Sequence, residues 1–289
     1  MGDAVPPYTS PYPPERPVHE TLAIIGCGHI GQALLTGLLA ATSDQPDRSA
    51  GKITRFIATT RGEATAEMLG QQYNKESDRV IIYTSENNLL AIRESGTVIL
   101  ACRPGDLDGI LNTDGIRFKL SRKLVISKRV CGEPSTDPTV VRAAPNLAAG
   151  WKCSMTIIEN REPLPEDRLA MVTWIFERVE QVKFLFGDAF CAGAMLASGG
   201  PAVMSVAVSG MFDGCVEGGL TQAETIAIGH QMLIGLVAPL NCPHHLLHMR
   251  ESAASCPKAP TIKTLNKLEK QGVRGLFADA MVEGIECVP

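Results

Sequence analysis

Three glycines, Gly26, Gly28 and Gly31, have the spacing that brings a phosphate group against the polypeptide backbone. In this pattern the first glycine permits a tight turn, the second lets the backbone approach a pyrophosphate, and the third allows close helix–strand packing. The N–H groups of the following helix, which begins around His29 and Ile30, then face the phosphates. A glycine turn with a purely structural use is the alternative interpretation.

The sequence around these glycines decides between the two interpretations. Thr21–Ile25 is short and almost continuously apolar, as a buried parallel strand is, and apolar residues from Ala33 to Leu39 then recur at helical spacing. A strand, a glycine turn and a helix in this order predict a dinucleotide-binding site.

The end of the second predicted strand bears on the choice of cofactor. An NAD site uses an Asp or Glu there to bind the ribose 2′-hydroxyl. Here the strand ends in Thr59, Thr60 and Arg61, and the first carboxylate is Glu63. Hydroxyl and guanidinium groups suit a 2′-phosphate, so the sequence favours NADPH over NADH. A solvated position at a helix start is the alternative interpretation of Arg61.

Strand and helix patterns alternate along the first two thirds of the chain, which predicts an α/β fold with a mostly parallel, doubly wound Rossmann-type sheet. The further expected strands are Ile53–Thr59, Val80–Tyr83, Thr97–Ala101, Leu124–Ser127, Met155–Ile158 and Val182–Leu185. Helices are expected at Glu63–Tyr73 and Asn88–Glu94, and then at Asp188–Gly219, Thr221–Ala238 and Lys263–Ile285. We therefore expect a disordered tail (1–20), a nucleotide-binding domain (21–187) and an all-helical domain (188–289).

The composition excludes some classes of protein. The 289 residues carry a net charge of -4, which argues against a protein that binds nucleic acid through phosphate neutralisation. None of the nine cysteines forms a CxxC pair, so reduced thiols and a cytoplasmic location are expected. The stretch between Asp188 and Asp213 has no charged residue, but its serines, glycines and proline favour a buried helix over a membrane span.

Four further segments carry a resemblance to a known family. They are Val98–Pro104 (VILACRP), Val141–Asn146 (VRAAPN), Ala197–Ala202 (ASGGPA) and Leu268–Gly275 (LEKQGVRG). In this order, and together with the glycine turn, they resemble pyrroline-5-carboxylate reductase, the last enzyme of proline biosynthesis. The resemblance covers about residues 21–286.

The resemblance implies a hydride transfer from NADPH to the carbon of a cyclic C=N bond, the cofactor performing the chemical step. It implies that Ala101, Cys102, Arg103 and Pro104 line the nicotinamide end of the cofactor. Pro145 and Asn146 would lie beside that end, and Asn88 near the adenosine. It also implies that the uncharged helix is buried in a homodimer or in a larger assembly of dimers.

The chain departs from the family where the substrate carboxylate is expected. The family's SPGGTT turn corresponds here to Cys256–Thr261, in which Lys258 and Ala259 replace both glycines and Pro260 has no N–H. Lys258 would add a positive charge, and Cys256 would stand in for a serine. Thr261 is the candidate for a hydrogen bond to the substrate nitrogen; a cap for the following helix is the alternative.

These departures leave the substrate open. We expect reduction of 1-pyrroline-5-carboxylate to proline, and the alternatives are a reductase of a different cyclic imine or an NADPH-binding protein without turnover. His244, His245 and His248 invite a metal interpretation, but without an HExxH pattern we expect a solvated loop and no metal.

Overall fold

The computed structural model describes residues 20–43, 53–127, 139–161, 164–240, 249, 251, 255 and 259–288. The tail expected at 1–20 thus lies outside the described residues, except for Glu20. The chain forms two compact units, which divide between Ala197 and Ser198. The domain boundary expected after Gly187 stays a prediction.

In the described residues, the first unit contains an eight-stranded sheet with the order β3-β2-β1-β4-β5-β6-β7-β8. The strands are β1 (Thr21–Ile25), β2 (Arg55–Thr60), β3 (Val80–Thr84), β4 (Thr97–Leu100), β5 (Leu124–Ser127), β6 (Thr139–Ala144), β7 (Ser154–Glu159) and β8 (Glu180–Leu185). Neighbours from β3 to β6 are parallel, β7 pairs antiparallel with β6, and β8 is parallel to β7. The mostly parallel, doubly wound sheet is confirmed.

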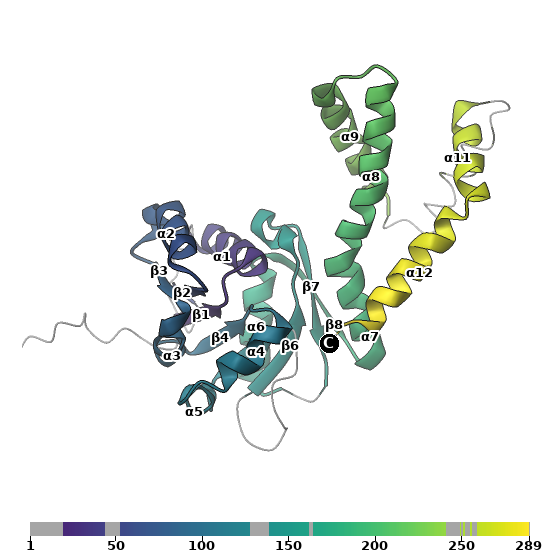
Figure 1. Cartoon of the computed structure of the whole chain (residues 1–289). Helices are drawn as coiled ribbons and strands as arrows, with labels where there is room; N and C mark the ends of the chain where they lie inside the picture. The colour runs from purple at the N-terminus through teal and green to yellow at the C-terminus, as the bar shows by residue number, and fades with distance from the viewer. Residues whose placement is uncertain are drawn as a thin grey trace, which may run out of the picture. The chain divides into compact units, whose positions relative to one another are not determined.

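Helices cover both faces of this sheet (Figure 1). They are α1 (His29–Thr42), α2 (Glu63–Gln72), α3 (Asn88–Arg93), α4 (Pro104–Leu111), α5 (Ile116–Leu120) and α6 (Glu166–Glu177), with α7 (Gly187–Ala194) following β8. Short 3-10 turns lie at Asn74–Glu76, Ser85–Asn87 and Leu147–Trp151.

Side chains along β1 alternate between the two faces of the sheet, and each face packs against its own layer of helices. Leu22 and Ile24 belong to one apolar cluster, with residues of α1, α2 and α6, whereas Ala23 and Ile25 belong to another, with residues of α3, α4 and α5. All four side chains are fully buried. Because both faces are covered, the strand can be apolar at every position, and this is why it has no polar alternation.

The strand order places a crevice at the carboxyl end of β1. From β1 the chain crosses to β2 on one side, whereas β4 pairs with β1 on the other side. In open α/β sheets this reversal of the winding direction is where ligands bind. The glycine turn after Ile25 lies at this point.

The structure corrects two sequence expectations in detail. Strand β6 was not among the expected strands, although it pairs with β5 from Leu124 to Ser127. The single helix expected at Lys263–Ile285 is wrong, because Gly272 has a φ of 67° and separates α11 from α12. A left-handed residue ends a helix, and glycine adopts this conformation without steric cost.

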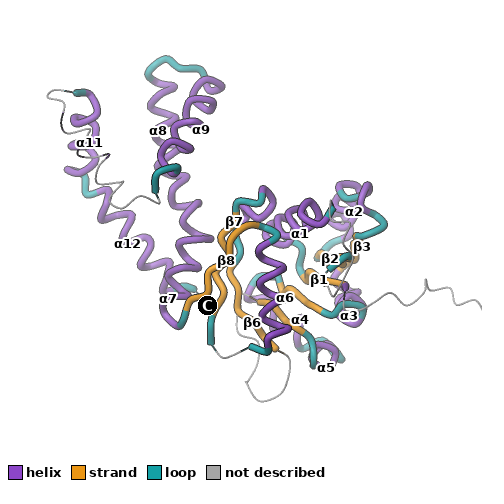
Figure 2. The backbone as a smooth tube through the Cα atoms, turned by 180° about the vertical axis from the view of Figure 1, so that it is seen from behind, coloured by secondary structure: helices purple, strands orange, loops and turns teal. Residues whose placement is uncertain are grey.

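The second unit is helical in its described residues. It contains α8 (Gly200–Glu217), α9 (Gln222–Val237), α11 (Pro260–Lys270) and α12 (Val273–Glu286), and a π-helical turn, Met195–Gly199, leads into α8. Helices α8 and α9 lie side by side (Figure 2). Helix α9 begins with a capping box, in which the Thr221 side chain accepts from the N–H of Glu224 and the Glu224 carboxylate accepts from the N–H of Thr221.

The continuous helix Gly187–Glu217 is long and apolar enough to cross a membrane by length and composition. Only 11% of its apolar window is buried within the chain. A single helix that passes this test is weak evidence for a membrane span.

Candidate functional site: a nucleotide groove and an apolar pocket

The glycine turn has a geometry that other residues would disturb. Gly26 has a φ of 82°, and a Cβ atom there would lie 2.8 Å from the Cα of Cys102. At Gly31 a Cβ would meet the Cγ2 of Ile24 at 3.1 Å, which is the close helix–strand contact expected of the third glycine. At Gly28, by contrast, a Cβ would meet no atom within 4 Å. The backbone at Gly28 is therefore open to a ligand, at the position expected to approach a pyrophosphate.

The three residues that end β2 have different surroundings. Thr59 and Thr60 are buried; the Thr59 hydroxyl accepts from the N–H of Gly26 at 3.3 Å, and the Thr60 hydroxyl donates to the carbonyl of Gly62 at 2.9 Å. The Arg61 side chain is 69% exposed, and its Nη2 lies 2.5 Å from Oδ2 of Asp106. Of the three, Arg61 is the residue whose charged end extends away from the core and is able to reach an anion.

These residues line one large groove of about 910 Å³ at the carboxyl ends of β1, β2 and β4. The groove collects eleven of the residues predicted to bind the cofactor: Gly26, Gly28, His29, Ile30, Thr59, Thr60, Arg61, Asn88, Ala101, Cys102 and Arg103. Residues far apart in the sequence are thus brought together in one groove. Gly31 packs beneath the turn instead.

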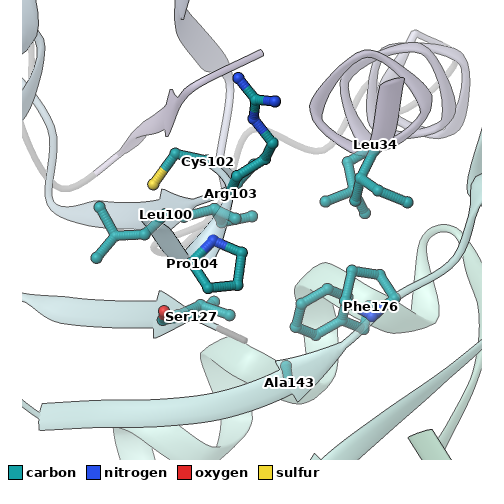
Figure 3. Close-up of a pocket in the computed structure, with 13 residues that line it drawn as sticks. Leu34, Leu100, Cys102, Arg103, Pro104, Ser127, Ala143 and Phe176 are labelled. Atoms are coloured by element: carbon teal, nitrogen blue, oxygen red, sulfur yellow. The ribbon is translucent and has the colours of Figure 1, made fainter. Parts of the chain in front are cut away.

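A second pocket of about 180 Å³ continues from this groove, since Ile30, Ala101, Cys102 and Arg103 line both. Its wall is mainly apolar and includes Leu34 of α1, Phe176 of α6, Ala143 of β6 and the ring of Pro104 (Figure 3). The predicted residues Pro104 and Pro145 belong to this pocket. A flat, largely apolar ring fits such a pocket at the ends of β4, β5 and β6.

An unpartnered atom tests whether the groove suits a nucleotide. Asn88 is 7% exposed and lines the groove, and its Oδ1 is buried without a hydrogen-bond partner in the described structure. A buried amide oxygen without a partner costs free energy unless a ligand donates to it. Adenosine carries amino and hydroxyl donors, so Asn88, the open Gly28 and the start of α1 fit the nucleotide predicted from sequence.

The structure places Asn146 differently from its neighbour Pro145. Asn146 lines neither of the two pockets, and both ends of its amide are engaged. Its Oδ1 accepts from the N–H of Ala148 at 2.9 Å, and its Nδ2 donates to the carbonyl of Ala197 at 2.7 Å. Its predicted contact with the cofactor stays a prediction; what the structure describes is a residue that fixes the connection after β6.

The predicted substrate turn is only partly described. Cys256 and Lys258 lie outside the described residues, as do His244, His245 and His248. Thr261 is the second residue of α11 and is exposed, whereas the N-cap is Ala259 and makes no side-chain capping bond. The interpretation of Thr261 as a helix cap is therefore wrong, and its role at the substrate nitrogen stays a prediction.

Several lining residues were not predicted from the sequence. In the groove these are Cys27, Thr65, Ser85, Gly105, Asp106, Gly109, Ile110 and Thr113. Half of them come from α4, which follows the predicted strand end directly. The position of Asp106, the third residue of a helix that begins at Pro104, was the available clue, because the first turn of such a helix faces the crevice.

Two cysteines near the site differ in exposure to solvent. Burial raises the pKa of the Cys27 thiol from 9.0 to about 12, so this thiol stays protonated and inert. Cys102 is partly exposed and lines both pockets. In the described residues no cluster of three metal-ligating side chains occurs.

A glycine turn at the switch point of a doubly wound sheet, an open groove and an adjoining apolar pocket define an NAD(P)H-dependent oxidoreductase. Comparison with known proteins narrows this class. Residues 21–130 match the family model described as NADP oxidoreductase, coenzyme F420-dependent, and residues 188–287 match the model described as pyrroline-5-carboxylate reductase dimerisation.

Similar proteins agree along most of the chain. The pyrroline-5-carboxylate reductase of Lophium arboricola is 32% identical over 291 residues, which cover 91% of this chain and 90% of that protein. That of Neurospora crassa is 30% identical, with the same shares covered. The chain therefore belongs to the pyrroline-5-carboxylate reductase family, and the resemblance inferred from its motifs is confirmed.

Solved structures support the fold. The crystal structure of the Plasmodium falciparum pyrroline carboxylate reductase with NADP bound has a TM-score of 0.73 and 17% sequence identity to this chain. The match covers 93% of this chain and 97% of that one.

Proposed function

We propose that this chain reduces the C=N bond of 1-pyrroline-5-carboxylate with NADPH and releases proline. The observation that carries the proposal is the continuity of the nucleotide groove with the apolar pocket at the ends of β4, β5 and β6. The lining of that pocket, which includes Pro104 and Pro145, would hold the nicotinamide ring. Family membership selects the substrate class.

The choice of NADPH rests on Arg61. Its guanidinium group lies at the end of β2, where the ribose 2′-position of a dinucleotide is bound in this fold. The matched N-terminal family model is that of an NADP oxidoreductase, and the Plasmodium falciparum reductase was crystallised with NADP bound. NADH remains the weaker cofactor in this proposal.

The protein's part in the reaction is to bind, orient and exclude water. Bound NADPH supplies the hydride. The N–H groups at the start of α1 would hold its pyrophosphate, Asn88 would accept a hydrogen bond from its adenosine, and apolar side chains around Phe176 would keep water from the ring. The Thr261 hydroxyl hydrogen-bonds the substrate ring nitrogen, and this bond orients the C=N carbon for attack.

The active form is a homodimer, alone or in a larger assembly, and it works in the cytoplasm. Helices of the second unit expose large apolar side chains in the single chain, including Val206, Ile226, Ile228 and Leu276. Exposed apolar area of this kind marks a protein interface, and residues 188–287 match the dimerisation model. The cytoplasmic location rests on the nine cysteines without a CxxC pair.

The direct test follows the absorbance of NADPH while purified enzyme is mixed with 1-pyrroline-5-carboxylate, and proline is then identified by mass spectrometry. Turnover to proline supports the proposal. NADPH binding without turnover on this compound or on a panel of other cyclic imines would contradict it and favour a non-catalytic NADPH-binding protein.

A related cyclic imine is the second candidate substrate, and the substrate turn favours it. Lys258 and Ala259 replace two glycines of the family pattern. Ala259 has a φ of -58°, which any residue adopts, so alanine costs nothing at this position. The triple variant Lys258→Gly, Ala259→Gly, Pro260→Thr restores the family turn. A shift of kcat/KM toward pyrroline-5-carboxylate relative to other imines would support the second candidate, and an unchanged preference would contradict it.

A further inference from the structure

One carboxylate stands among the groups that line the nucleotide groove. Asp106 is the only acidic side chain among the described lining residues, and its Oδ2 faces two arginines. The distance from Oδ2 to Nη2 of Arg61 is 2.5 Å, and that to Nε of Arg103 is 3.3 Å. A single oxygen atom thus partners both guanidinium groups of the groove.

These three residues come from the strand ends that flank the glycine turn. Arg61 follows β2, whereas Arg103 and Asp106 follow β4, and β1 lies between these two strands in the sheet. Arg61 and Asp106 are 45 residues apart in sequence. Their ion pair therefore links the two sides of the crevice where the adenosine end of a dinucleotide is bound in this fold.

The ion pairs of Asp106 with Arg61 and Arg103 are too exposed to contribute much to the stability of the fold. The side chains of Arg61, Arg103 and Asp106 are 69%, 73% and 39% exposed, and exposed ion pairs contribute little to folding. A phosphate group carries more charge than a carboxylate and accepts the guanidinium fork in a bidentate manner. A 2′-phosphate can thus replace Asp106 as the partner of the Arg61 guanidinium. The phosphate must then lie beside the Asp106 carboxylate, which carries the same sign of charge.

A ribose 2′-hydroxyl has the opposite relation to this carboxylate. It is uncharged, it can donate a hydrogen bond to an ionised acid, and it has no need of Arg61. The same side chain therefore opposes a phosphorylated ribose and tolerates an unmodified one.

We propose that Asp106 is a specificity-determining residue that competes with the cofactor 2′-phosphate for Arg61 and thereby weakens the preference for NADPH over NADH. This inference rests on the proposed use of NADPH, and it goes beyond it by assigning a counteracting residue. The discrimination between the two cofactors is then set by two opposing side chains, Arg61 and Asp106.

The test measures binding, so that it is independent of turnover. Isothermal titration calorimetry of the full-length protein compares 2′,5′-ADP with 5′-AMP, and NADPH with NADH, for the wild type and Asp106→Asn. We expect the variant to bind 2′,5′-ADP and NADPH about threefold to tenfold more tightly, chiefly because Arg61 is freed from its ion pair with Asp106 and can bind the phosphate, and to a smaller extent because a like charge is removed. The affinities for 5′-AMP and NADH should stay within about twofold or fall slightly. The gain should shrink at high salt, which screens exposed charges.

Two further variants make the outcome decisive. Asp167→Asn removes an exposed carboxylate that lies 3.5 Å from Arg168 on α6, a helix that contributes none of the groove's lining residues. This variant should leave unchanged the ratio of the affinities for 2′,5′-ADP and 5′-AMP, and that for NADPH and NADH. In the double variant Arg61→Gln/Asp106→Asn the gain should disappear, since the freed guanidinium is its main source.

Unchanged or weaker 2′,5′-ADP binding by Asp106→Asn would overturn the inference, since Asp106 would then be inert or would hold Arg61 in place for the phosphate. An equal gain with Asp167→Asn would also overturn it. Failure of the proposed function looks different: the wild type would bind neither NADPH nor 2′,5′-ADP, or would bind them without turning over pyrroline-5-carboxylate.

Discussion

The side-chain amide of Asn146 donates to the carbonyl oxygen of Ala197 over 2.7 Å, within the π-helical turn Met195–Gly199. The other end of the amide accepts from the N–H of Ala148. Asn146 is 7% exposed, so both of these side-chain bonds are shielded from water. The residue joins the chain after β6 to the helix after β8.

Replacing this amide should destabilise the first unit. Asn146→Ala removes both side-chain hydrogen bonds, and the loss of these buried bonds costs about 1–3 kcal/mol of unfolding free energy. Asn146→Asp keeps the acceptor for Ala148 but puts a carboxylate against the carbonyl of Ala197, so its loss should be at least as large. Urea unfolding measures both. The exposed residue Asn74 provides the control Asn74→Ala, and a loss at Asn146 no greater than at Asn74 would contradict the structural role.

Gly26 and Gly28 offer a matched pair of substitutions with opposite consequences. Gly26→Ala places a Cβ 2.8 Å from the Cα of Cys102 at a φ of 82°, so it should cost about 2 kcal/mol or more of stability. Gly28→Ala meets no atom of the fold within 4 Å and should change stability by less than about 0.5 kcal/mol. It should nevertheless weaken NADPH binding about tenfold or more, because the Cβ occupies the space needed by the pyrophosphate.

Thermal unfolding and NADPH titration of both variants test this separation. If Gly28→Ala binds NADPH as tightly as the wild type, the pyrophosphate does not lie against this turn. If Gly26→Ala is as stable as the wild type, the steric account of the turn is wrong.

Strands that are buried on both faces were the most predictable part of the fold. Thr21–Ile25 was predicted with its observed bounds, since its apolar run ends in glycine and both layers require apolar side chains there. Strand β6 was missed because its sequence carries Arg142, and an arginine argues against a buried strand. The structure shows why it is tolerated: Arg142 pairs with Glu159 of β7 at 3.1 Å and lies over the ring of Phe190.

The candidate site was most accessible to prediction where local sequence determines it. The glycine turn and the end of β2 follow directly from their strands, so Arg61 was expected at the groove from the local sequence, whereas Cys102 was expected there from the family resemblance. Asp106 was not, because its role depends on the proximity of Arg61, which is 45 residues away. The bond from Asn146 to Ala197 likewise depends on a tertiary contact that no local pattern encodes.

The buried thiol of Cys27 predicts a pH dependence. Its pKa is raised from 9.0 to about 12, so the unfolded thiol ionises at lower pH than the folded one. The contribution of the protonated Cys27 thiol to the free energy of unfolding is complete below pH 9 and is lost as the pH rises from about 9 toward 12. The free energy of unfolding should therefore fall more steeply above pH 9 in the wild type than in Cys27→Ala.

Alkylation gives a second test of the burial that raises this pKa. At pH 8 the folded Cys27 should react with iodoacetamide about a thousandfold more slowly than an ordinary thiol, since the thiolate is the nucleophile. Cys153, which is exposed, serves as the control within the same chain. Mass spectrometry should find Cys27 labelled only after denaturation, and equal labelling of the two residues in the native protein would contradict its burial.

Thr261 allows the proposed hydrogen bond to the substrate nitrogen to be tested without loss of the fold. It is exposed in the first turn of α11 and is not the N-cap, so Thr261→Val should change stability by less than about 0.5 kcal/mol. Loss of a hydrogen bond that orients the substrate should lower kcat/KM for the imine about tenfold or more, while the dissociation constant of NADPH stays the same. Thr261→Ser keeps the hydroxyl and should retain most of the activity. Steady-state kinetics of the three proteins decide the matter, because equal activity of the valine and serine variants would show that the hydroxyl has no part in the reaction.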